Sequence, residues 1–243
     1  MRAGLRNAWH TIAPPAGDPD GTLPPLLLAL TVVTGLVDAF SYLVLGHVFV
    51  ANMTGNVVFI GFAMAGAGGF SIPASLLALG AFSVGAVWGG RLGLHLRGHR
   101  TRLLAAATAI EVGLVAGSTI VAATTAAPGS GAARYALIAL LGLTMGGQNA
   151  VARSLAVPDL TTTVLTLTIT GIFADGRLAE GTSSKVGRRL LSVLAMFVGG
   201  VAGALLVLRV SIPLGIGAAL IPLCLVAIAA GRGRAEPYRG SSG

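Results

Sequence analysis

The chain has 243 residues, of which 54% are hydrophobic and only 10% charged, and its mean hydropathy is +0.86. Since soluble globular domains carry about 25% charged residues, this composition argues against a soluble protein. The net charge of +8 would indicate a nucleic-acid partner in a soluble protein, but here Lys and Arg lie beside apolar spans, where they orient a membrane protein, so no nucleic acid is expected.

The two ends of the chain differ from the apolar region between them. Residues 1–23 contain Pro14-Pro15, Asp18-Pro19-Asp20 and Gly21, which predicts a mobile, non-helical leader. The leader lacks the positive, apolar and small-residue regions of a cleavable signal, so the first apolar span should remain as an anchor. Residues 231–243 are predicted to form a disordered basic tail.

Residues 24–230 are predicted to form a single transmembrane domain. Apolar stretches of roughly 20 residues recur through it, which is typical of an all-α polytopic membrane protein. The apolar segments are 26–46, 48–66, 72–90, 103–127, 135–152, 160–174, 190–208 and 212–230.

The segments 48–66 and 160–174 are unusual because each begins directly after its predecessor and is polar near its start. The second is ~22 Å long as a helix, shorter than the ~30 Å hydrocarbon core. If all eight segments cross, 10 of the 16 Lys and Arg residues lie inside and 6 outside. If these two are re-entrant, 14 lie inside and 2 outside, which the positive-inside rule prefers. We therefore expect six full transmembrane helices, two short re-entrant or discontinuous helices, and both termini in the cytoplasm.

Three crossings per half give the halves opposite orientations, so residues 24–127 and 133–230 are predicted to be inverted repeats. Gly35-x-x-Asp38-Ala39 is echoed by Gly146-x-x-Asn149-Ala150, and the GxxxG pattern at Gly85 is echoed at Gly199. The two short elements should then meet near the midplane, as in several transporter folds. Small residues at GxxxG spacing allow helices to approach closely, and exposed GxxxG faces are compatible with a homo-oligomer.

Asp38 is the first candidate for a functional side chain. We expect it near mid-membrane, where a charged carboxylate costs at least ~2.5–3.5 kcal/mol and must face protein or water. It is either a proton or cation site or an acid that fixes the re-entrant loop by accepting backbone N–H groups. Its counterpart in the second half is the amide of Asn149, with Gln148 beside it.

Asn52, Thr54 and Asn56 begin the first short element, with Asn52 as the expected N-cap. Helix N-termini at this depth polarise a bound solute; the alternative is ordinary capping and helix–helix hydrogen bonding. Glu111 is the other buried acid, and it either relays protons with Asp38 or bonds across helices. The predicted solute or proton site comprises Asp38, Asn52, Thr54, Asn56, Glu111, Gln148, Asn149, Thr162 and Thr163.

Enzyme chemistry is not expected. Cys224 is the single cysteine, which excludes an internal disulfide, and no His/Cys cluster has metal-ligand spacing. The sequence has no nucleophile with a base and no carboxylate pair on a loop. We therefore expect no metal, no cofactor and no catalytic residues.

Two runs of sequence carry a family resemblance. GLVDAFSYLVLGHVFVANMTGN, from Gly35 to Asn56, closely resembles the YoaK family of bacterial inner-membrane proteins, as do GQNAVAR from Gly147 and DLTTTVLT from Asp159. The resemblance covers residues 24–230 and implies a multi-pass protein of the inner membrane. The family is defined by a domain of unknown function, so it implies neither substrate nor catalytic residues.

Together these features favour a transporter or channel-like permease for a small polar or ionic solute, with membrane lipid and a solute or proton as partners. The alternative is a non-transporting membrane scaffold or sensor, in which the polar motif only packs the re-entrant elements. A membrane enzyme acting on lipid is the third and weakest hypothesis.

Overall fold

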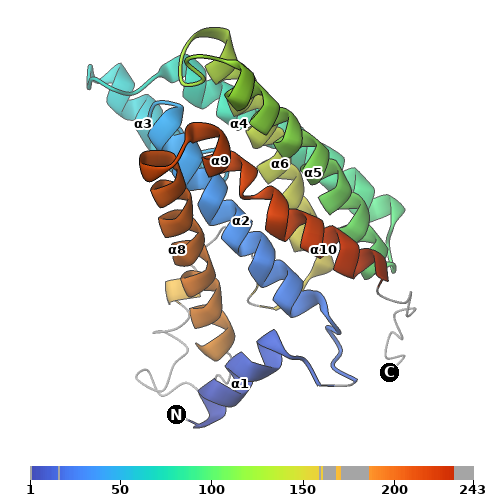
Figure 1. The fold of residues 1–243 in the computed structure, drawn as a ribbon. Coiled ribbons are helices and arrows are strands. Elements are labelled where there is room, and N and C mark those ends of the chain that lie inside the picture. Colours follow the sequence, from blue (N-terminus) through green and yellow to red (C-terminus); the bar gives the residue numbers. More distant parts are fainter. Residues whose placement is uncertain (1, 16, 159, 161–167, 171–185, 233–243) are drawn as a thin grey trace.

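The computed structural model describes residues 2–15, 17–158, 160, 168–170 and 186–232 (Figure 1). All regular structure in these ranges is helical, and six helical segments are long and apolar enough to cross a membrane. The first five are α2 (Leu23–Val44), α4 (Ile72–His95), α5 (Arg100–Thr124), α6 (Gly131–Leu155) and α8 (Val186–Arg209), and the sixth comprises α9 (Ile212–Gly217) and α10 (Leu220–Arg232).

These helices confirm the prediction of an all-α polytopic membrane protein. The segment 48–66 contains only α3 (Met53–Met64), whose 12 residues are too few to span a ~30 Å hydrocarbon core. The second predicted short element, 160–174, lies largely outside the described residues.

The break between α9 and α10 has a local cause. Pro222 has no N–H to donate to the carbonyl of Ala218, four residues earlier. The carbonyl of Ala218 instead accepts from the Ile221 N–H at 3.3 Å, and helical bonding resumes with Leu223 N–H to Ala219. The sixth span is therefore one apolar segment with a bend.

The leader differs from its prediction. Residues Arg2–Ile12 form helix α1, which contacts α8, so the expectation of a non-helical leader is wrong for this stretch. The helix breakers that motivated that expectation, Pro14-Pro15 and Asp18-Pro19, all follow α1 and end it without entering it. The Arg188 backbone N–H donates to Asn7 Oδ1 at 3.1 Å, which ties α1 to the start of α8.

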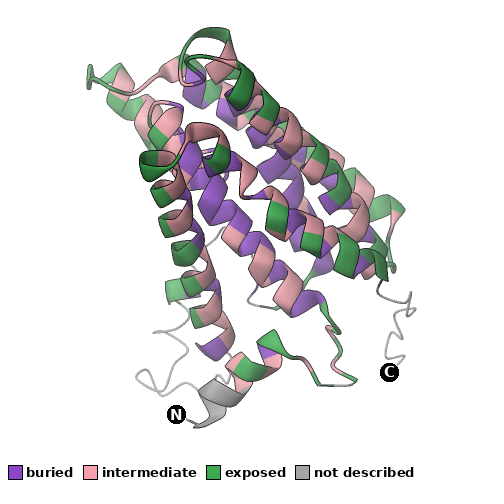
Figure 2. Ribbon diagram, viewed as in Figure 1, coloured by how far each residue is buried: buried purple, intermediate pink, exposed green. Residues whose placement is uncertain are grey.

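The spanning helices form a central ring with two outer helices. Helices α2, α6, α5 and α10 contact one another in turn, α4 packs outside on α6, and α8 packs outside on α2. Buried residues concentrate on α2 and α6, whereas the residues of α8 are mostly exposed or half-buried (Figure 2). Its exposed large apolar side chains, which suit contact with lipid tails, are Leu190, Leu194, Phe197, Val198, Val201, Leu205 and Leu208.

Glycines allow the two outer contacts, and the contacts are equivalent. A Cβ on Gly35 of α2 would overlap Met196 O and lie 2.7 Å from Gly200 N of α8. A Cβ on Gly146 of α6 would overlap Phe82 O and lie 2.9 Å from Ala86 N of α4. The first span of each predicted repeat thus packs on the GxxxG helix of the other, as an inverted repeat requires.

Two of the GxxxG patterns are used for contacts within the chain. Gly85 and Gly89 of α4 lie against α6, and Gly199 and Gly203 of α8 lie against α2. Gly113 and Gly117 of α5 have the same spacing, and a Cβ at either meets nothing within 4 Å. A homo-oligomer through an exposed GxxxG face therefore stays a prediction.

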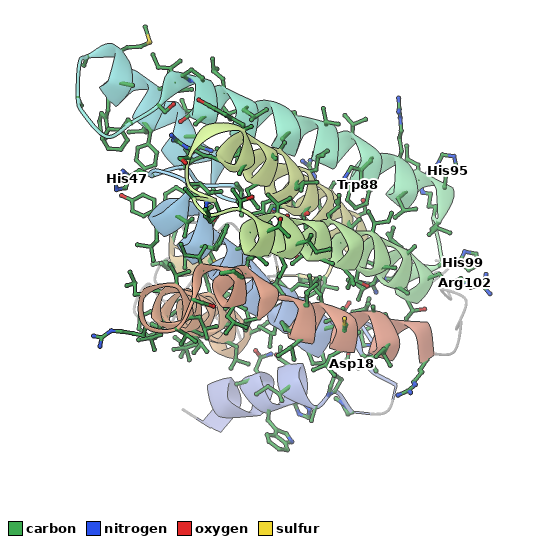
Figure 3. All side chains as sticks on the ribbon, turned by 45° about the horizontal axis from the view of Figure 1, so that its top comes forward. Asp18, His47, Trp88, His95, His99 and Arg102 are labelled. Atoms are coloured by element: carbon green, nitrogen blue, oxygen red, sulfur yellow. The ribbon has the colours of Figure 1, made fainter. Side chains whose placement is uncertain are left out.

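Basic residues gather at one end of the bundle. In Figure 3, His95, His99 and Arg102 lie at the α4–α5 end, far from His47. Arg134 at the start of α6 and Arg209 at the end of α8 lie at the opposite end, as the alternation of helix directions requires. The helices thus agree with the charge distribution that favoured six crossings.

Cysteine accessibility tests this topology. On a Cys224→Ser background, single cysteines at the exposed positions His47 and Ala67, which flank α3, should react with a membrane-impermeant thiol reagent from one side. A cysteine at Arg97, after α4, should react only from the other side. Labelling of His47 and Ala67 from opposite sides would mean that α3 crosses the bilayer.

Candidate functional site

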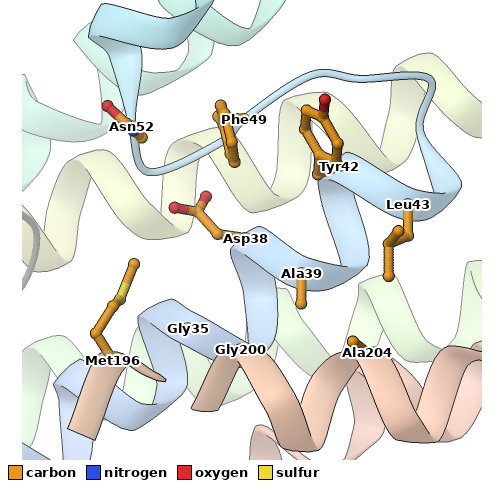
Figure 4. A pocket seen from close by; sticks show the side chains of 10 residues that line it. All are labelled: Gly35, Asp38, Ala39, Tyr42, Leu43, Phe49, Asn52, Met196, Gly200 and Ala204. Atoms are coloured by element: carbon orange, nitrogen blue, oxygen red, sulfur yellow. The ribbon is translucent and has the colours of Figure 1, made fainter. Parts of the chain in front are cut away.

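A pocket of about 390 Å³ lies between α2, α8 and the loop that follows α2 (Figure 4). The lining residues of α2 recur every three or four positions, and those of α8 recur every four positions, so each set lies on one face of its helix. Helix α2 is in the first half of the chain and α8 in the second, so the pocket lies between the two predicted repeats. The lining residues are Gly35, Asp38, Ala39, Tyr42, Leu43, Phe49, Asn52, Met196, Gly200 and Ala204.

The loop reaches this pocket because the chain reverses after α2. Gly46 and His47 adopt left-handed φ angles of 78° and 57°, which glycine accepts without strain. Arg134 of α6 donates from Nε to Leu45 O at 2.7 Å and from Nη2 to Gly46 O at 3.5 Å. A cation at the carbonyl end of α2 is also favoured by the helix dipole, so Arg134 fixes where the reversal occurs.

Asp38 receives the returning loop. Its Oδ1 accepts the Ala51 N–H at 3.1 Å, and its side chain is only 6% exposed. Asp38 precedes the end of α2 at Val44 by six residues, or about 9 Å, so it lies in the half of the helix nearer the loop. Asp38 is the sixteenth of the 22 residues of α2, within about 7 Å of the middle of the helix, and its mid-membrane depth stays a prediction.

The loop and α3 form the re-entrant element of the first half. The chain leaves the end of α2, dips to the level of Asp38 and continues into α3, whose N-cap position is Asn52. Helix α3 packs on α4, and α4 then starts the return crossing. The N-terminus of α3 therefore opens next to the Asp38 carboxylate (Figure 4).

Asn56 holds this element by pairing with both backbone groups of one residue. Its Oδ1 accepts the Phe49 N–H at 3.0 Å and its Nδ2 donates to Phe49 O at 2.6 Å, with the side chain fully buried. Gly55 leaves room for the Phe49 ring, since a Cβ there would lie 2.7 Å from Phe49 Cδ2. Asn56 thus holds the loop on α3, through bonds that are neither helix capping nor helix–helix hydrogen bonds.

An aromatic cluster extends from the pocket toward the start of α4. The rings of Tyr42 and Phe49 stack with centroids 5.0 Å apart, and Phe49 stacks on Phe59 at 5.8 Å. Phe59 in turn stacks on Phe70 at 5.0 Å, just before α4. These contacts join α2, the loop, α3 and α4 into one apolar unit whose inner edge is the pocket wall.

Of the predicted site residues on α2 and at the start of α3, two line the pocket. Asp38 and Asn52 line it, although the Asn52 side chain makes no capping hydrogen bond. Thr54 is exposed on α3 and does not line the pocket. Thr162 and Thr163 lie outside the described residues.

The candidates on α5 and α6 lie elsewhere. Gln148 is buried and donates to Thr34 Oγ1 of α2 at 2.8 Å, and Asn149 donates to Met145 O of its own helix at 2.8 Å. Glu111 is buried on α5 and does not line the pocket. Within the described part of the chain, no group of three or more His, Cys, Asp or Glu could hold a metal ion.

Several lining residues were missed by reasoning from polar motifs. Tyr42 is one helical turn beyond Asp38, and Gly35 is one turn before it, so helical spacing alone could have found both. Met196 and Gly200 belong to the GxxxG region of α8, whose small residues predicted a close helix contact but not its partner. No feature of the sequence pointed to Phe49.

Replacing Asn56 by alanine tests the role of the loop. Two hydrogen bonds are lost and the Phe49 backbone groups lose their partner, so the free energy of unfolding should fall by about 2–4 kcal/mol. Thermal unfolding in detergent measures this, with the exposed Thr54→Ala on the same helix as a control that should change stability by less than about 0.5 kcal/mol. Equal stability of the two variants would contradict the role given to Asn56.

Comparison with known proteins supports the family resemblance expected from the motifs. A family model described as "Protein of unknown function (DUF1275)" matches residues 26–231. The chain is 34% identical over 155 residues to the UPF0700 transmembrane protein YoaK of Bacillus subtilis (strain 168), covering 63% of this chain and 68% of that protein. No solved structure matches the chain.

Proposed function

Since the chain belongs to the DUF1275 family of transmembrane proteins, whose function is unknown, we propose from its pocket that it is a permease for a small organic cation. It acts in the bacterial inner membrane with both termini in the cytoplasm, the orientation that gives 14 basic residues inside. The proposal involves no catalytic step, metal or cofactor.

The observation that carries the proposal is a carboxylate in an otherwise apolar pocket between the two halves. Among the described residues that line the pocket, Asp38 is the only carboxylic acid, and none is Lys or Arg. The stacked rings of Tyr42 and Phe49 lie beside it (Figure 4). A carboxylate with aromatic faces favours a cation that carries apolar groups and disfavours an anion.

An ion-pair bridge links the two halves at the end of the bundle opposite the loop, which supports alternating access. Asp20 Oδ1 lies 3.3 Å from Arg100 Nη2 of α5, and Asp20 Oδ2 lies 3.4 Å from Arg188 Nη1 of α8. Arg100 also donates to Leu155 O at the end of α6, at 2.5 Å. Because α5 and α8 belong to different halves, rocking of one half against the other would break this bridge.

Uptake into proteoliposomes tests the proposal directly. Radiolabelled tetramethylammonium and a primary alkylamine are the probes, with a neutral sugar and a carboxylate as controls. We expect saturable uptake of a cationic probe and none of the controls. Uptake of none of the cations, or of the carboxylate alone, would contradict the proposal.

A variant that fills the pocket sharpens this test. A Cβ on Gly200 meets no atom within 4 Å, so Gly200→Leu should fill the pocket without separating α8 from α2. Uptake should fall at least about 10-fold, equivalent to about 1.4 kcal/mol. Gly90→Leu on α4, where a Cβ also meets nothing within 4 Å, is the matched control and should transport normally.

A membrane scaffold is the alternative, and two bonds favour it. Asp38 accepts the Ala51 N–H, and Asn56 pairs with Phe49, so both polar residues already hold the loop. A scaffold predicts no uptake by the wild type and no effect of Gly200→Leu beyond stability. The same flux measurements therefore separate the two functions.

A further inference from the structure

Glu111 is the second acid within the transmembrane helices, and it lies apart from the Asp38 pocket. Its side chain is 1% exposed on α5, and neither carboxylate oxygen has a hydrogen-bond partner among the described residues. An ionised carboxylate there would have lost its water without gaining a donor.

Gln148 of α6 carries the other buried oxygen that lacks a donor. Its Nε2 donates to Thr34 Oγ1 at 2.8 Å and lies 3.4 Å from Leu30 O, which uses both amide hydrogens. Because a carbonyl oxygen only accepts, the Leu30 contact fixes the orientation of the amide. Oε1 is then directed away from these α2 groups and has no partner in the described residues.

The two orphaned groups lie on antiparallel helices in contact, at similar depth. Arg100 near the start of α5 donates to Leu155 O at the end of α6, so these two helix ends lie together. Glu111 is 11 residues from Arg100 and Gln148 is seven residues from Leu155, so their positions along the helix axes differ by about four residues, or ~6 Å. Side chains lean toward the N-terminus of their helix, so on antiparallel helices these two lean toward each other.

Within the described part of the chain, no charged group on the helices that contact α5 lies at this depth to compensate a carboxylate. The helices that contact α5 are α4, α6, α9 and α10, and Arg100 and Arg102 lie at the start of α5 itself. Apart from half-buried Cys224, the other titratable groups on these contacting helices lie near helix ends. These groups are Arg91, His95, Arg134, Tyr135, Arg153 and Arg232. Asp38 is on α2, which pairs with α6 and α10 in the ring.

We propose that Glu111 binds a proton inside the ring of α2, α6, α5 and α10, and that the protonated carboxyl donates to Gln148 Oε1. One O–H group then satisfies both orphaned groups. Proton binding itself needs no transport, so this site stands apart from the proposed function.

Its role in coupling rests on the proposed function. Glu111 belongs to the first half and Gln148 to the second, so the hydrogen bond joins the halves. Release of the proton to water breaks that bond and leaves Gln148 Oε1 without its donor. Movement of one half against the other and proton release are thereby linked.

Infrared spectroscopy of the full-length protein in lipid bilayers at neutral pH tests the site. The wild type should show a carboxylic acid C=O band that shifts in D₂O and is absent from Glu111→Gln. The band should persist in Asp38→Asn, which excludes Asp38 as its source. Absence of any difference between wild type and Glu111→Gln would mean that Glu111 is ionised and would overturn the proposal.

The acceptor is tested by Gln148→Leu, which should shift the band to the higher frequency of a free carboxylic acid. An unchanged frequency would refute the hydrogen bond.

Should Glu111→Gln fail to fold, a variant with Glu180→Gln and Glu236→Gln leaves Glu111 as the only glutamate. Carboxyl ¹³C-labelled glutamate must then shift the band, and no shift would overturn the proposal. These signals do not depend on flux, so failure of the uptake assay leaves their result intact.

Discussion

Uptake of tetramethylammonium is expected to fall about 100-fold when Asp38 is replaced by asparagine, equivalent to about 2.7 kcal/mol. The described lining of the pocket offers a cation no other charged partner, and burial makes the lost attraction large. The fold should survive, because the asparagine Oδ1 can still accept the Ala51 N–H that Asp38 accepts at 3.1 Å. Initial uptake rates in proteoliposomes measure the effect.

Asp38→Ala is the companion variant that separates charge from structure. It removes both the charge and the acceptor, so it should lose uptake and also unfold at a lower temperature. If Asp38→Asn transports like the wild type while Asp38→Ala is unstable, Asp38 only holds the loop and the scaffold alternative gains.

Two neighbouring glycines of α8 are expected to respond in opposite ways to alanine. A Cβ on Gly199 would overlap Val32 O of α2, so Gly199→Ala must separate two tightly packed helices. We expect a loss of about 2 kcal/mol or more in the free energy of unfolding. A Cβ on Gly200 meets nothing within 4 Å, so Gly200→Ala should be neutral or stabilise the helix by up to about 1 kcal/mol.

The glycines of α4 extend this prediction to a test of the predicted repeat. Gly85→Ala on α4, the repeat counterpart of Gly199, should destabilise likewise, since its Cβ would overlap Leu143 O of α6, whereas Gly90→Ala should not. Thermal unfolding of the four variants in one detergent compares them. A harmless Gly199→Ala or a damaging Gly200→Ala would contradict the packing described for α2 and α8.

The spanning helices were predictable because the bilayer imposes a simple rule on sequence. Long apolar runs had to cross, and the asymmetry of basic residues identified 48–66 as a segment that does not, in agreement with the short α3. Helix α1 was missed because Pro14-Pro15 and Asp18-Pro19 dominated the reading of the leader. Proline residues that follow a short helix do not prevent the residues before them from forming that helix.

The site was predicted less completely, for a physical reason. Asp38 and Asn52 could be found because a polar group in an apolar span needs a partner. Which partner it has depends on how helices meet in space, so Asn56 proved structural and Glu111 lies away from Asp38. Met196, more than 150 residues from Asp38 in the chain, lines the same pocket only because α8 packs on α2.

Protection of a pocket cysteine is the measurement that tests the central claim most directly. Ala204 lines the pocket from α8, so Ala204→Cys on a Cys224→Ser background should react with an impermeant thiol reagent in proteoliposomes. Tetramethylammonium should slow this reaction, and Asp38→Asn should abolish the protection. A reaction rate unaffected by the cation, or protection that persists in Asp38→Asn, would contradict a cation site at Asp38.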